Sequence, residues 1–446
     1  MVEFALCLQP VIFKFEGAGV PEKRFTVLSL FSGGMGLDIG LEQSGQFHHL
    51  ACIEKVPAFC ETIRRNRDAG LVGDKDLRVY EADLSELDPF EVMANLGVKP
   101  GSVDLIAGGP PCQAFSVFGK RRGLADGRGM LILDYLRFVE AFQPRAFLME
   151  NVRGLLSMTT AEDLHKGALF EMVQDRFDGL GYRTDCFVVN SVNYGAPQIR
   201  ERIVVIGNRH NLLSDFPRPT HSDHPEENLP PFATLGDAIR GKADPDPTVM
   251  HFSERKQKYL AMVPPGGNWR SLPLPIQKES MGKSFFLKGG RSAHWRKLSF
   301  EFPCPTIMTL PNHAGTSMCH PELLRPLTVG ECALVQGFPP EWTFVGTPGE
   351  KYQQVGNAVP IVLGRLGGGS VIDLLGRMAS IQGPAPGPIR PNRVLHLRPH
   401  VRTRCWWKDG QIIDGLPYSQ RPGRKKARKA GPSLFDWIPP SVEEEL

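Results

Sequence analysis

A cysteine that follows two prolines is the first candidate for chemistry in the sequence. The apolar run 103–109 leads into Pro110, Pro111 and Cys112. The prolines restrict the backbone, so they would hold the Cys112 thiol at the end of a strand, where it could act as a nucleophile. A lone cysteine is more often a small buried hydrophobic residue, but a core cysteine gains nothing from a Gly-Gly-Pro-Pro segment. The polar, basic and glycine-rich residues 113–130 are predicted to form a loop that closes over a substrate.

A carboxylate and two arginines follow or precede other apolar runs. Glu150 comes directly after AFLM, where burial would favour its protonated form and suit a general acid. The alternative for Glu150 is a partner of a helix N-cap. Arg200 and Arg202 precede IVVIG, and strand alternation places them on one face, where they could hold phosphate or carbonyl oxygens. The alternative for this pair is a salt-bridged strand end.

A glycine-rich turn at residues 32–36 indicates a bound nucleoside. It follows the apolar run 25–31, and acidic residues follow the next two runs, Glu54 and Asp83. A carboxylate after the second strand suits ribose hydroxyls, and Asp83 would accept a hydrogen bond from an adenine amino group. The turn alone is weak evidence, because such turns also bind NAD or merely pack a helix tightly. Together the three features favour a nucleoside-bearing cofactor.

These candidate residues would need a fold that brings the ends of several strands together. Residues 25–208 have the alternating strand and helix pattern of such a fold. Short apolar runs alternate with segments of helical periodicity, and they are predicted as strands at 25–31, 49–54, 77–83, 103–109, 145–151 and 202–208. This rhythm predicts an α/β fold with a mostly parallel sheet covered by helices on both faces. Ligands of such sheets bind beyond the carboxyl ends of the strands, where the candidate residues lie.

The rest of the chain divides into two regions of different character. Residues 209–325 are rich in Pro, His, Asn and Ser and predict a loop-rich recognition region, after which helical patterns resume at 325–338 and 352–376. Residues 381–446 hold twelve Lys or Arg against six Asp or Glu, a net charge of +6. This Pro- and Gly-rich tail is expected to be too broken for a continuous packed element. Its basic cluster, 421–429, would contact a polyanion such as nucleic acid or simply be solvated.

Composition excludes several classes of protein. The 446 residues are 41% hydrophobic, and no run of 18 apolar residues occurs, so we expect no transmembrane helix. The nine cysteines include no Cys-x-x-Cys pair, which argues against a disulfide framework and a zinc ribbon and fits a reducing cytoplasm. His221 and His224 have no cysteine partner nearby, so we expect a structural role for both and no metal site.

Six motifs in a fixed order make the sequence similar to one family. The motifs are FSGGMG, GGPPCQAFS, MENVRG, QIRERIVVIG, RPLTVGECALVQGFP and QQVGNAV. In their residues and their order they resemble the DNA (cytosine-5) methyltransferases, in particular the stand-alone bacterial type of restriction–modification systems. The resemblance implies a Rossmann-like, S-adenosylmethionine-dependent catalytic domain in 1–208 and 351–380. It implies a smaller, loop-rich target recognition domain in 209–350 and leaves 381–446 as a tail outside the family core.

The resemblance also implies the reaction and the role of each residue. A methyl group would pass from S-adenosylmethionine to C5 of cytosine, leaving S-adenosylhomocysteine, while Cys112 adds to C6. Protonated Glu150 would donate to N3, Arg202 would polarise O2, and Arg200 would hold the adjoining phosphate or steady the closed loop. The cofactor-binding residues would be Phe31, Gly33, Gly34, Gly36, Glu54, Asp83, Pro110, Asn357 and Val359. One departure is Ser29, at a position where the family usually carries Asp.

Double-stranded DNA is the partner that the resemblance implies. A cytosine inside a duplex cannot reach Cys112, so the base would be flipped out of the stack. The loop 113–130 would close around it and contact backbone phosphates through Ser116, Lys120, Arg121, Arg122 and Arg128. We expect a monomer in the bacterial cytoplasm at the nucleoid, paired functionally with a restriction endonuclease and not bound to a membrane.

Two other functions remain open on sequence grounds. Some proteins of this fold methylate tRNA, although the long recognition region favours DNA and the Cys-Phe-Thr signature of the RNA enzymes is absent. A non-catalytic DNA-binding relative would keep the fold alone, although every expected catalytic residue is present. A nicotinamide-dependent oxidoreductase shares the glycine-rich turn but leaves Cys112, Glu150 and the arginine pair without a role.

Overall fold

The computed structural model describes residues 24–111, 131–160, 163–287, 291–381 and 390–397, and the backbone of 407–408 and 411–412. Cys112 and the expected loop 113–130 therefore lie outside the described residues. So does the basic cluster 421–429.

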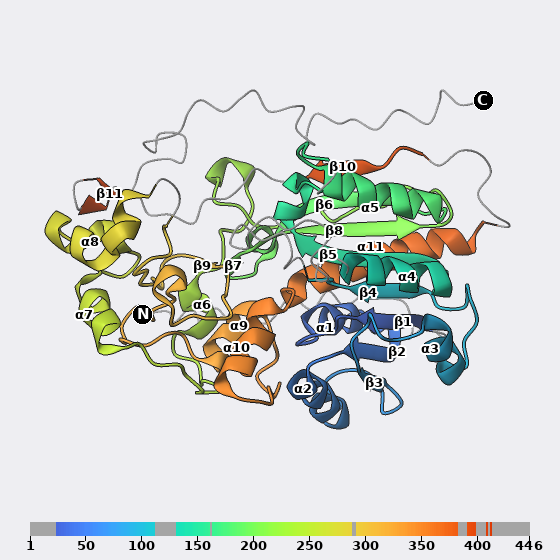
Figure 1. The fold of residues 1–446 in the computed structure, drawn as a ribbon, viewed down its shortest axis with the longest axis horizontal. Coiled ribbons are helices and arrows are strands. Elements are labelled where there is room, and N and C mark those ends of the chain that lie inside the picture. The colour runs from blue at the N-terminus through green and yellow to red at the C-terminus, as the bar shows by residue number, and fades with distance from the viewer. Residues whose placement is uncertain are drawn as a thin grey trace, which may run out of the picture.

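An eight-stranded sheet forms the centre of the larger part of the molecule (Figure 1). The strand order is β10-β6-β8-β5-β4-β1-β2-β3. β8 runs antiparallel to both neighbours, and all other neighbouring pairs are parallel, which confirms the mostly parallel sheet. The strands are β1 (Phe25–Leu30), β2 (Phe47–Glu54), β3 (Arg78–Glu81), β4 (Leu105–Gly108), β5 (Ala146–Val152), β6 (Arg183–Asn190), β8 (Glu201–Asn208) and β10 (Arg393–His396).

Helices cover both faces of this sheet because successive strand residues point to opposite sides. Leu28 and Leu30 share one hydrophobic cluster with α3, α4 and α5, whereas Val27 belongs to the opposite cluster with α1 and α11. Within the described residues no single helix is long and apolar enough to span a membrane, although α10 and α11, taken together across a 40° bend, pass that test. The helices of this part are α1 (Gly36–Glu42), α2 (Pro57–Asp68), α3 (Pro89–Leu96), α4 (Leu131–Phe142), α5 (Ala168–Gly179), α10 (Pro348–Asn357) and α11 (Ile361–Ala379).

Helices α1 and α11 approach so closely that glycine is required at their contact. A Cβ on Gly40 would lie 2.4 Å from the carbonyl oxygen of Ile361, and one on Gly364 would lie 2.4 Å from that of Leu37. Real Cβ atoms do not come so close, so the two glycines bring the backbones into contact. The close packing fixes the start of α11 beside the turn that precedes α1.

The recognition region builds a smaller lobe with a core of its own (Figure 1). Its cluster joins side chains between residues 252 and 319, among them Trp269 and Trp295. Residues at either end of the region, on α6 and α9, instead share a cluster with α1, α2 and α10. The expected domain boundary at 209–350 stays a prediction. The elements here are β7 (Gln198–Ile199), α6 (Leu235–Ile239), α7 (Glu254–Met262), α8 (Leu274–Met281), β9 (Cys304–Pro305) and α9 (Val329–Gln336), with the hairpin β11 (Trp407–Lys408) and β12 (Gln411–Ile412) further along the chain.

Two strands of the sheet were missed by the sequence analysis. β6 is buried along its whole length, and its Arg183 and Asp185 side chains are fully buried and form an ion pair. β10 lies in the tail that was expected to be too broken for a continuous packed element, and its residues 393–396 form a short strand that pairs in parallel with β6. Arg393 holds β10 there, because its Nε donates to the Asp185 carboxylate over 2.7 Å. β8 was predicted as a strand, but its antiparallel direction was not predicted.

Candidate active site

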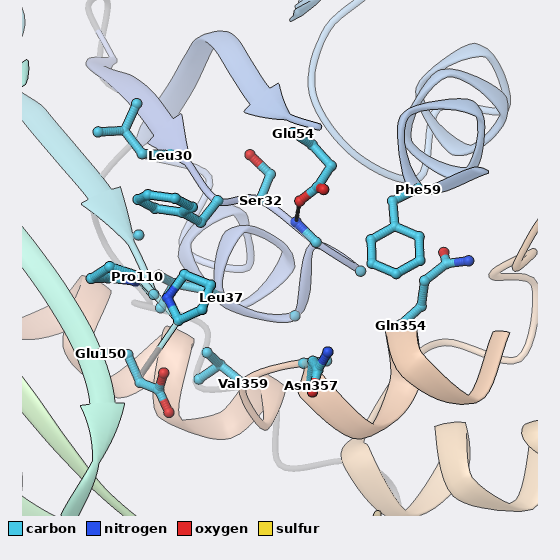
Figure 2. Close-up of a pocket in the computed structure, with 18 of the residues that line it drawn as sticks. Leu30, Ser32, Leu37, Glu54, Phe59, Pro110, Glu150, Gln354, Asn357 and Val359 are labelled. Carbon is cyan, nitrogen blue, oxygen red and sulfur yellow. Dashed lines mark hydrogen bonds between the residues drawn. The ribbon is translucent and has the colours of Figure 1, made fainter. Parts of the chain in front are cut away.

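One cavity of about 630 Å³ lies beyond the carboxyl ends of the parallel strands, where β1, β2, β4 and β5 meet the end of α10 (Figure 2). Every expected cofactor-binding or catalytic residue that the structure describes lines it. These residues are Phe31, Gly33, Gly34, Gly36, Glu54, Asp83, Pro110, Glu150, Arg200, Arg202, Asn357 and Val359. The other expected residues, Cys112, Ser116, Lys120, Arg121, Arg122 and Arg128, lie outside the described residues.

The glycine-rich turn after β1 holds Glu54 in a fixed position. Its backbone takes left-handed conformations at Phe31 (φ 55°), Gly33 (φ 53°) and Met35 (φ 65°), which is strained for the two residues with side chains. The Gly33 N–H donates to Oε2 of Glu54 over 2.9 Å, the bond drawn in Figure 2. The Lys55 and Val56 N–H groups donate to Oε1, each over 2.9 Å. Burial raises the pKa of Glu54, and these three bonds oppose the rise.

The same end of the cavity has the donors, acceptors and apolar surface that a nucleoside needs. A carboxylate offers about four acceptor positions, and Glu54 uses three on the backbone, so it can accept from one further hydroxyl. Asp83 is half-buried and stays ionised: burial opposes this, but hydrogen bonds from Ser85 and the nearby Lys55 outweigh it and lower the pKa. Phe59 of α2 also lines this end of the cavity, to the right of Glu54 in Figure 2. The residues therefore fit an adenosine-containing group.

Glu150 and Arg202 form a buried pair at another part of the cavity. Glu150 lies opposite Val204 in the antiparallel pairing of β5 with β8, and Arg202 lies opposite Val152, so both side chains share one face as diagonal neighbours. Nε of Arg202 lies 2.9 Å from Oε1 of Glu150. Burial raises the pKa of Glu150 even though Arg202 and Arg200 oppose the rise. A raised pKa favours the protonated form of Glu150, which is the form that can donate a proton.

The side chain of Arg200 forms hydrogen bonds to the backbone of two other segments. Its side chain is 2% exposed. Nη1 donates to the carbonyl oxygens of Gly356 (3.0 Å) and Ile307 (3.4 Å), and Nη2 to that of Asn357 (3.4 Å). Burial, together with the charge of Arg202, lowers the pKa of Arg200 well below its ordinary value. These contacts favour a bridging role for Arg200 over a direct contact with a DNA phosphate.

Asn151 fixes the proline segment that leads to Cys112, a role that the sequence analysis missed. Its side chain is 4% exposed, and its Nδ2 donates to the carbonyl oxygen of Pro110 over 3.0 Å. Its Oδ1 accepts from the Val152 N–H. The amide thus ties β5, which carries Glu150, to the segment that carries the expected nucleophile. Its place directly after Glu150 in MENVRG was the signal that could have identified it.

Other lining residues could not have been identified from local patterns. Phe59 lies on α2, Gln354 on α10, and residues 306–309 follow β9 in the recognition region. They come to the cavity only through tertiary packing, because α2, α9 and α10 share a hydrophobic cluster. Residues 306–309 give the recognition region a direct share in the wall of the cavity.

Among the residues that the structure describes, one group of side chains with metal-ligand chemistry comes together, and none of its members lines the cavity. Ligand atoms of His48, Asp74 and Asp76 lie within 4.8 Å of one another. Ion pairs account for this arrangement, since Arg24 and His48 both contact the same oxygen of Asp74, over 2.5 Å and 2.8 Å. His221 bonds to Thr220, and His224 to Glu226.

Comparison with known proteins assigns the chain to a family. Residues 25–368 match the family described as C-5 cytosine-specific DNA methylase. The chain belongs to this family. The Type II methyltransferase M.Eco47II of Escherichia coli is 38% identical over 361 residues, which cover 79% of this chain and 80% of that protein. The Type II methyltransferase M.Sau96I of Staphylococcus aureus is 36% identical over 354 residues, covering 79% and 77%.

Solved structures share the fold of this DNA cytosine-5 methyltransferase. A DNA modification methyltransferase encoded within an E. coli prophage superposes with a TM-score of 0.54 at 24% identity, covering 79% of this chain and 99% of that one. The Entamoeba histolytica methyltransferase EhMeth gives a TM-score of 0.51 at 14% identity, covering 79% and 99%. The predicted Rossmann-like methyltransferase fold and the predicted enzyme class are confirmed. The family uses S-adenosylmethionine, and its substrate is DNA.

Proposed function

We propose that this enzyme methylates C5 of a cytosine that is flipped out of duplex DNA at a short specific sequence, through a covalent bond between Cys112 and C6. The observation that carries the proposal is the single cavity that contains both Glu54 with its glycine turn and the Glu150–Arg202 pair. Pro110 lies between them in Figure 2, and Cys112 follows two residues later in the chain. A methyl donor and a base in this cavity would face each other.

The cofactor end would bind S-adenosylmethionine. Glu54 would accept a hydrogen bond from the ribose and Asp83 from the adenine amino group, while Phe31 and Phe59 would contact the adenosine. Asn357 and Val359, on the opposite side of the cavity from Glu54 in Figure 2, would contact the remainder of the cofactor. When bound, S-adenosylmethionine supplies a methyl group on a sulfonium centre and leaves as S-adenosylhomocysteine.

The residues at the base end would make C5 nucleophilic. The Cys112 thiolate forms a bond to C6, the ring electrons shift, and the Glu150 carboxyl group gives its proton to N3. Arg202 donates to O2 and limits the negative charge on the ring. After C5 accepts the methyl group, its proton passes to solvent, N3 returns its proton to Glu150, and the C6–sulfur bond breaks to release the thiolate. The final steps restore the aromatic ring and leave the enzyme unchanged.

DNA recognition is assigned to two regions. Residues 209–350 would read the base sequence, which is supported by the separate hydrophobic cluster between 252 and 319. The loop 113–130 would close around the flipped base, and Ser116, Lys120, Arg121, Arg122 and Arg128 stay predicted phosphate contacts. Because its curated relatives carry Type II methyltransferase names, we infer a pairing with a restriction endonuclease of the same specificity. A monomer stays the predicted state.

A mechanism-based trap tests the proposal. The protein is incubated with S-adenosylmethionine and, in parallel reactions, with duplex DNA or tRNA that carries 5-fluorocytosine, whose fluorine cannot leave C5 as a proton would. We expect a complex that survives denaturing electrophoresis, and none with Cys112→Ser. Cys60→Ser is the matched control, because burial raises the pKa of the Cys60 thiol to about 12 and it does not line the cavity. A trap on tRNA but not on DNA would assign the reaction to RNA, and no trap on either would refute the adduct.

A further inference from the structure

Two buried glutamine amides meet at the boundary between the sheet and the recognition region. Gln198 of β7 is 0% exposed and Gln336 of α9 is 2% exposed. Nε2 of Gln198 donates to Oε1 of Gln336 over 2.7 Å, although 138 residues separate them in the chain. Neither residue lines the cavity.

The other polar atom of each amide forms hydrogen bonds to the backbone of a different segment. Oε1 of Gln198 accepts from the Ile307 N–H over 2.9 Å. Nε2 of Gln336 donates to the carbonyl oxygens of Val355 (2.7 Å) and Ala358 (3.1 Å). Only one orientation of each amide satisfies these partners, because rotation by 180° would face oxygen to oxygen or N–H to N–H. The two side chains thus form a continuous hydrogen-bonded relay from Ile307 to the end of α10.

Both ends of this relay carry walls of the cavity. Ile307 lines it between Thr306 and Met308, where the recognition region contributes to the wall. Ala358 itself lines it, and Val355 directly precedes Gly356 and Asn357, which line it at the end of α10. The same two walls are bridged a second time by Arg200, which donates to the carbonyl oxygens of Ile307 and Gly356. The hydrogen bonds of the glutamine pair and those of Arg200 thus hold the same two segments at a fixed distance from each other.

We propose that Gln198 and Gln336 are positioning residues that fix the distance between the wall at Ile307 and the cofactor-side wall at Asn357. This inference rests on the proposed function, in which a base and a methyl donor meet between those walls. Methyl transfer requires the two reacting atoms in line at about 3–3.5 Å, and a displacement of about 1 Å can cost about 100-fold in rate. Gln336 acts through Asn357 and Gln198 through Ile307, so neither touches substrate or cofactor.

The test replaces one amide with a side chain of similar length and no hydrogen-bonding group. Gln336→Met removes the bonds to Gln198, Val355 and Ala358. The matched control is Gln277→Met, because Nε2 of Gln277 also donates to two carbonyl oxygens, those of Leu272 (2.8 Å) and Arg270 (3.2 Å), but does not line the cavity or contact its walls. Three quantities are measured for each protein: the thermal midpoint, the affinity for S-adenosylhomocysteine without DNA, and kcat and KM on duplex DNA.

We expect Gln336→Met to weaken S-adenosylhomocysteine binding by about 5- to 10-fold and to lower kcat by about 10- to 100-fold through misplacement of the walls. Gln277→Met should stay within about twofold on both quantities even though it also loses hydrogen bonds and some thermal stability. The double variant Gln198→Met/Gln336→Met should lose little more than the stronger single variant, since both remove one shared bond. The positioning role would be refuted if Gln336→Met lowered the thermal midpoint as Gln277→Met does but left S-adenosylhomocysteine binding and kcat unchanged.

A shorter amide keeps the proposal testable if Gln336→Met does not fold. Gln336→Asn retains the amide but cannot span the same gap, and we expect an intermediate loss of S-adenosylhomocysteine affinity and kcat. An Asn variant with wild-type values for both would contradict the proposal. The binding measurement separates this inference from the proposed function, because it can be made even if the wild-type protein transfers no methyl group to DNA.

Discussion

Nε of Arg202 lies 2.9 Å from Oε1 of Glu150, yet the pKa of this carboxyl group remains raised. Burial dominates over the positive charges of Arg202 and Arg200, both of which lose solvation in the same place. An ion pair that only stabilised the fold would be expected to lower the pKa of the carboxylate. Under the proposed function, this raised pKa suits Glu150 to proton donation.

Glu150→Gln tests proton donation. The amide keeps the size of the side chain and still accepts from Arg202, but it cannot give a proton to N3. We expect kcat on duplex DNA to fall by about 10²- to 10⁴-fold, with S-adenosylhomocysteine affinity within about threefold. The exposed Glu91→Gln on α3 is the control and should retain full activity. A kcat within tenfold of the wild type would contradict the role of Glu150.

The same variant has an expected effect on stability that depends on pH. Because the folded protein raises the pKa of Glu150, the folded state binds this proton more tightly than the unfolded chain. The wild type thus loses stability relative to Glu150→Gln as pH rises above the ordinary carboxyl pKa of 4.5. We expect a higher thermal midpoint for Glu150→Gln than for the wild type at pH 8, and a smaller difference at pH 5. A lower midpoint for the variant at pH 8 would show that the ion pair is net stabilising.

His49 should make stability depend on pH in the alkaline range. Burial alone would lower the pKa of this imidazole, but Asp38 and Glu42, at 3.1 Å and 2.8 Å from its two nitrogens, raise it to about 9. Because the pKa is raised, the interaction of protonated His49 with the two carboxylates contributes its full stabilisation below pH 6.5. This contribution is lost as pH rises through about 9. The full effect is about 3 kcal/mol. Urea unfolding at pH 6.5 and 9.5 should show this loss in the wild type and not in His49→Gln; parallel losses would refute it.

Helix packing predicts opposite effects for two glycines of α11. Gly364→Ala would force a Cβ to within 2.4 Å of the Leu37 carbonyl oxygen, so we expect a loss of about 2 kcal/mol or more. Gly376 is exposed, and a Cβ there would meet nothing within 4 Å. Gly376→Ala should therefore stabilise the protein by about 0.5–1 kcal/mol through helix propensity. Thermal midpoints measure both, and an unchanged or higher midpoint for Gly364→Ala would contradict the contact between α1 and α11.

Arg393 tests whether the strand at the edge of the sheet belongs to the fold. Its guanidinium donates to Asp185 over 2.7 Å and to the Ser214 carbonyl oxygen over 2.8 Å. Arg393→Ala leaves a buried carboxylate with one partner fewer, and we expect a loss of about 1–3 kcal/mol. Arg390→Ala is the control: Arg390 is exposed, its backbone N–H alone bonds to Asn211, and its substitution should change stability by less than about 0.5 kcal/mol. Equal midpoints for the two variants would show that β10 contributes nothing.

Sequence patterns predicted the strands that carry chemistry because those strands are nearly pure apolar runs. β1, β4, β5 and β8 each end or begin beside a candidate residue, and all twelve expected cofactor-binding and catalytic residues that the structure describes line one cavity. β6 was missed because Arg183 and Asp185 give it the appearance of a polar segment, although the two charges neutralise each other inside the fold. β10 was missed because it is short and lies among prolines and arginines.

Contacts across long stretches of chain could not be predicted. Arg200 bonds to residues 107 to 157 positions away, and Gln198 to Gln336 across 138 positions. Sequence reasoning placed Arg200 near a ligand because of its spacing from Arg202, but its partners are backbone carbonyl oxygens, which leave no signature in side-chain types. Gln198 and Gln336 fall within recognised motifs, and nothing in those motifs indicates that their amides meet.

The most direct test of the central claim is to map methylated cytosines in a living cell. The protein is expressed in a bacterial host that lacks cytosine methylation, and the host DNA is bisulfite-sequenced, with Cys112→Ser expressed at equal level as the control. We expect protected cytosines confined to one short sequence motif with the wild type, and none with Cys112→Ser. An unprotected genome despite soluble protein that binds S-adenosylmethionine, or protection that persists in Cys112→Ser, would contradict the account.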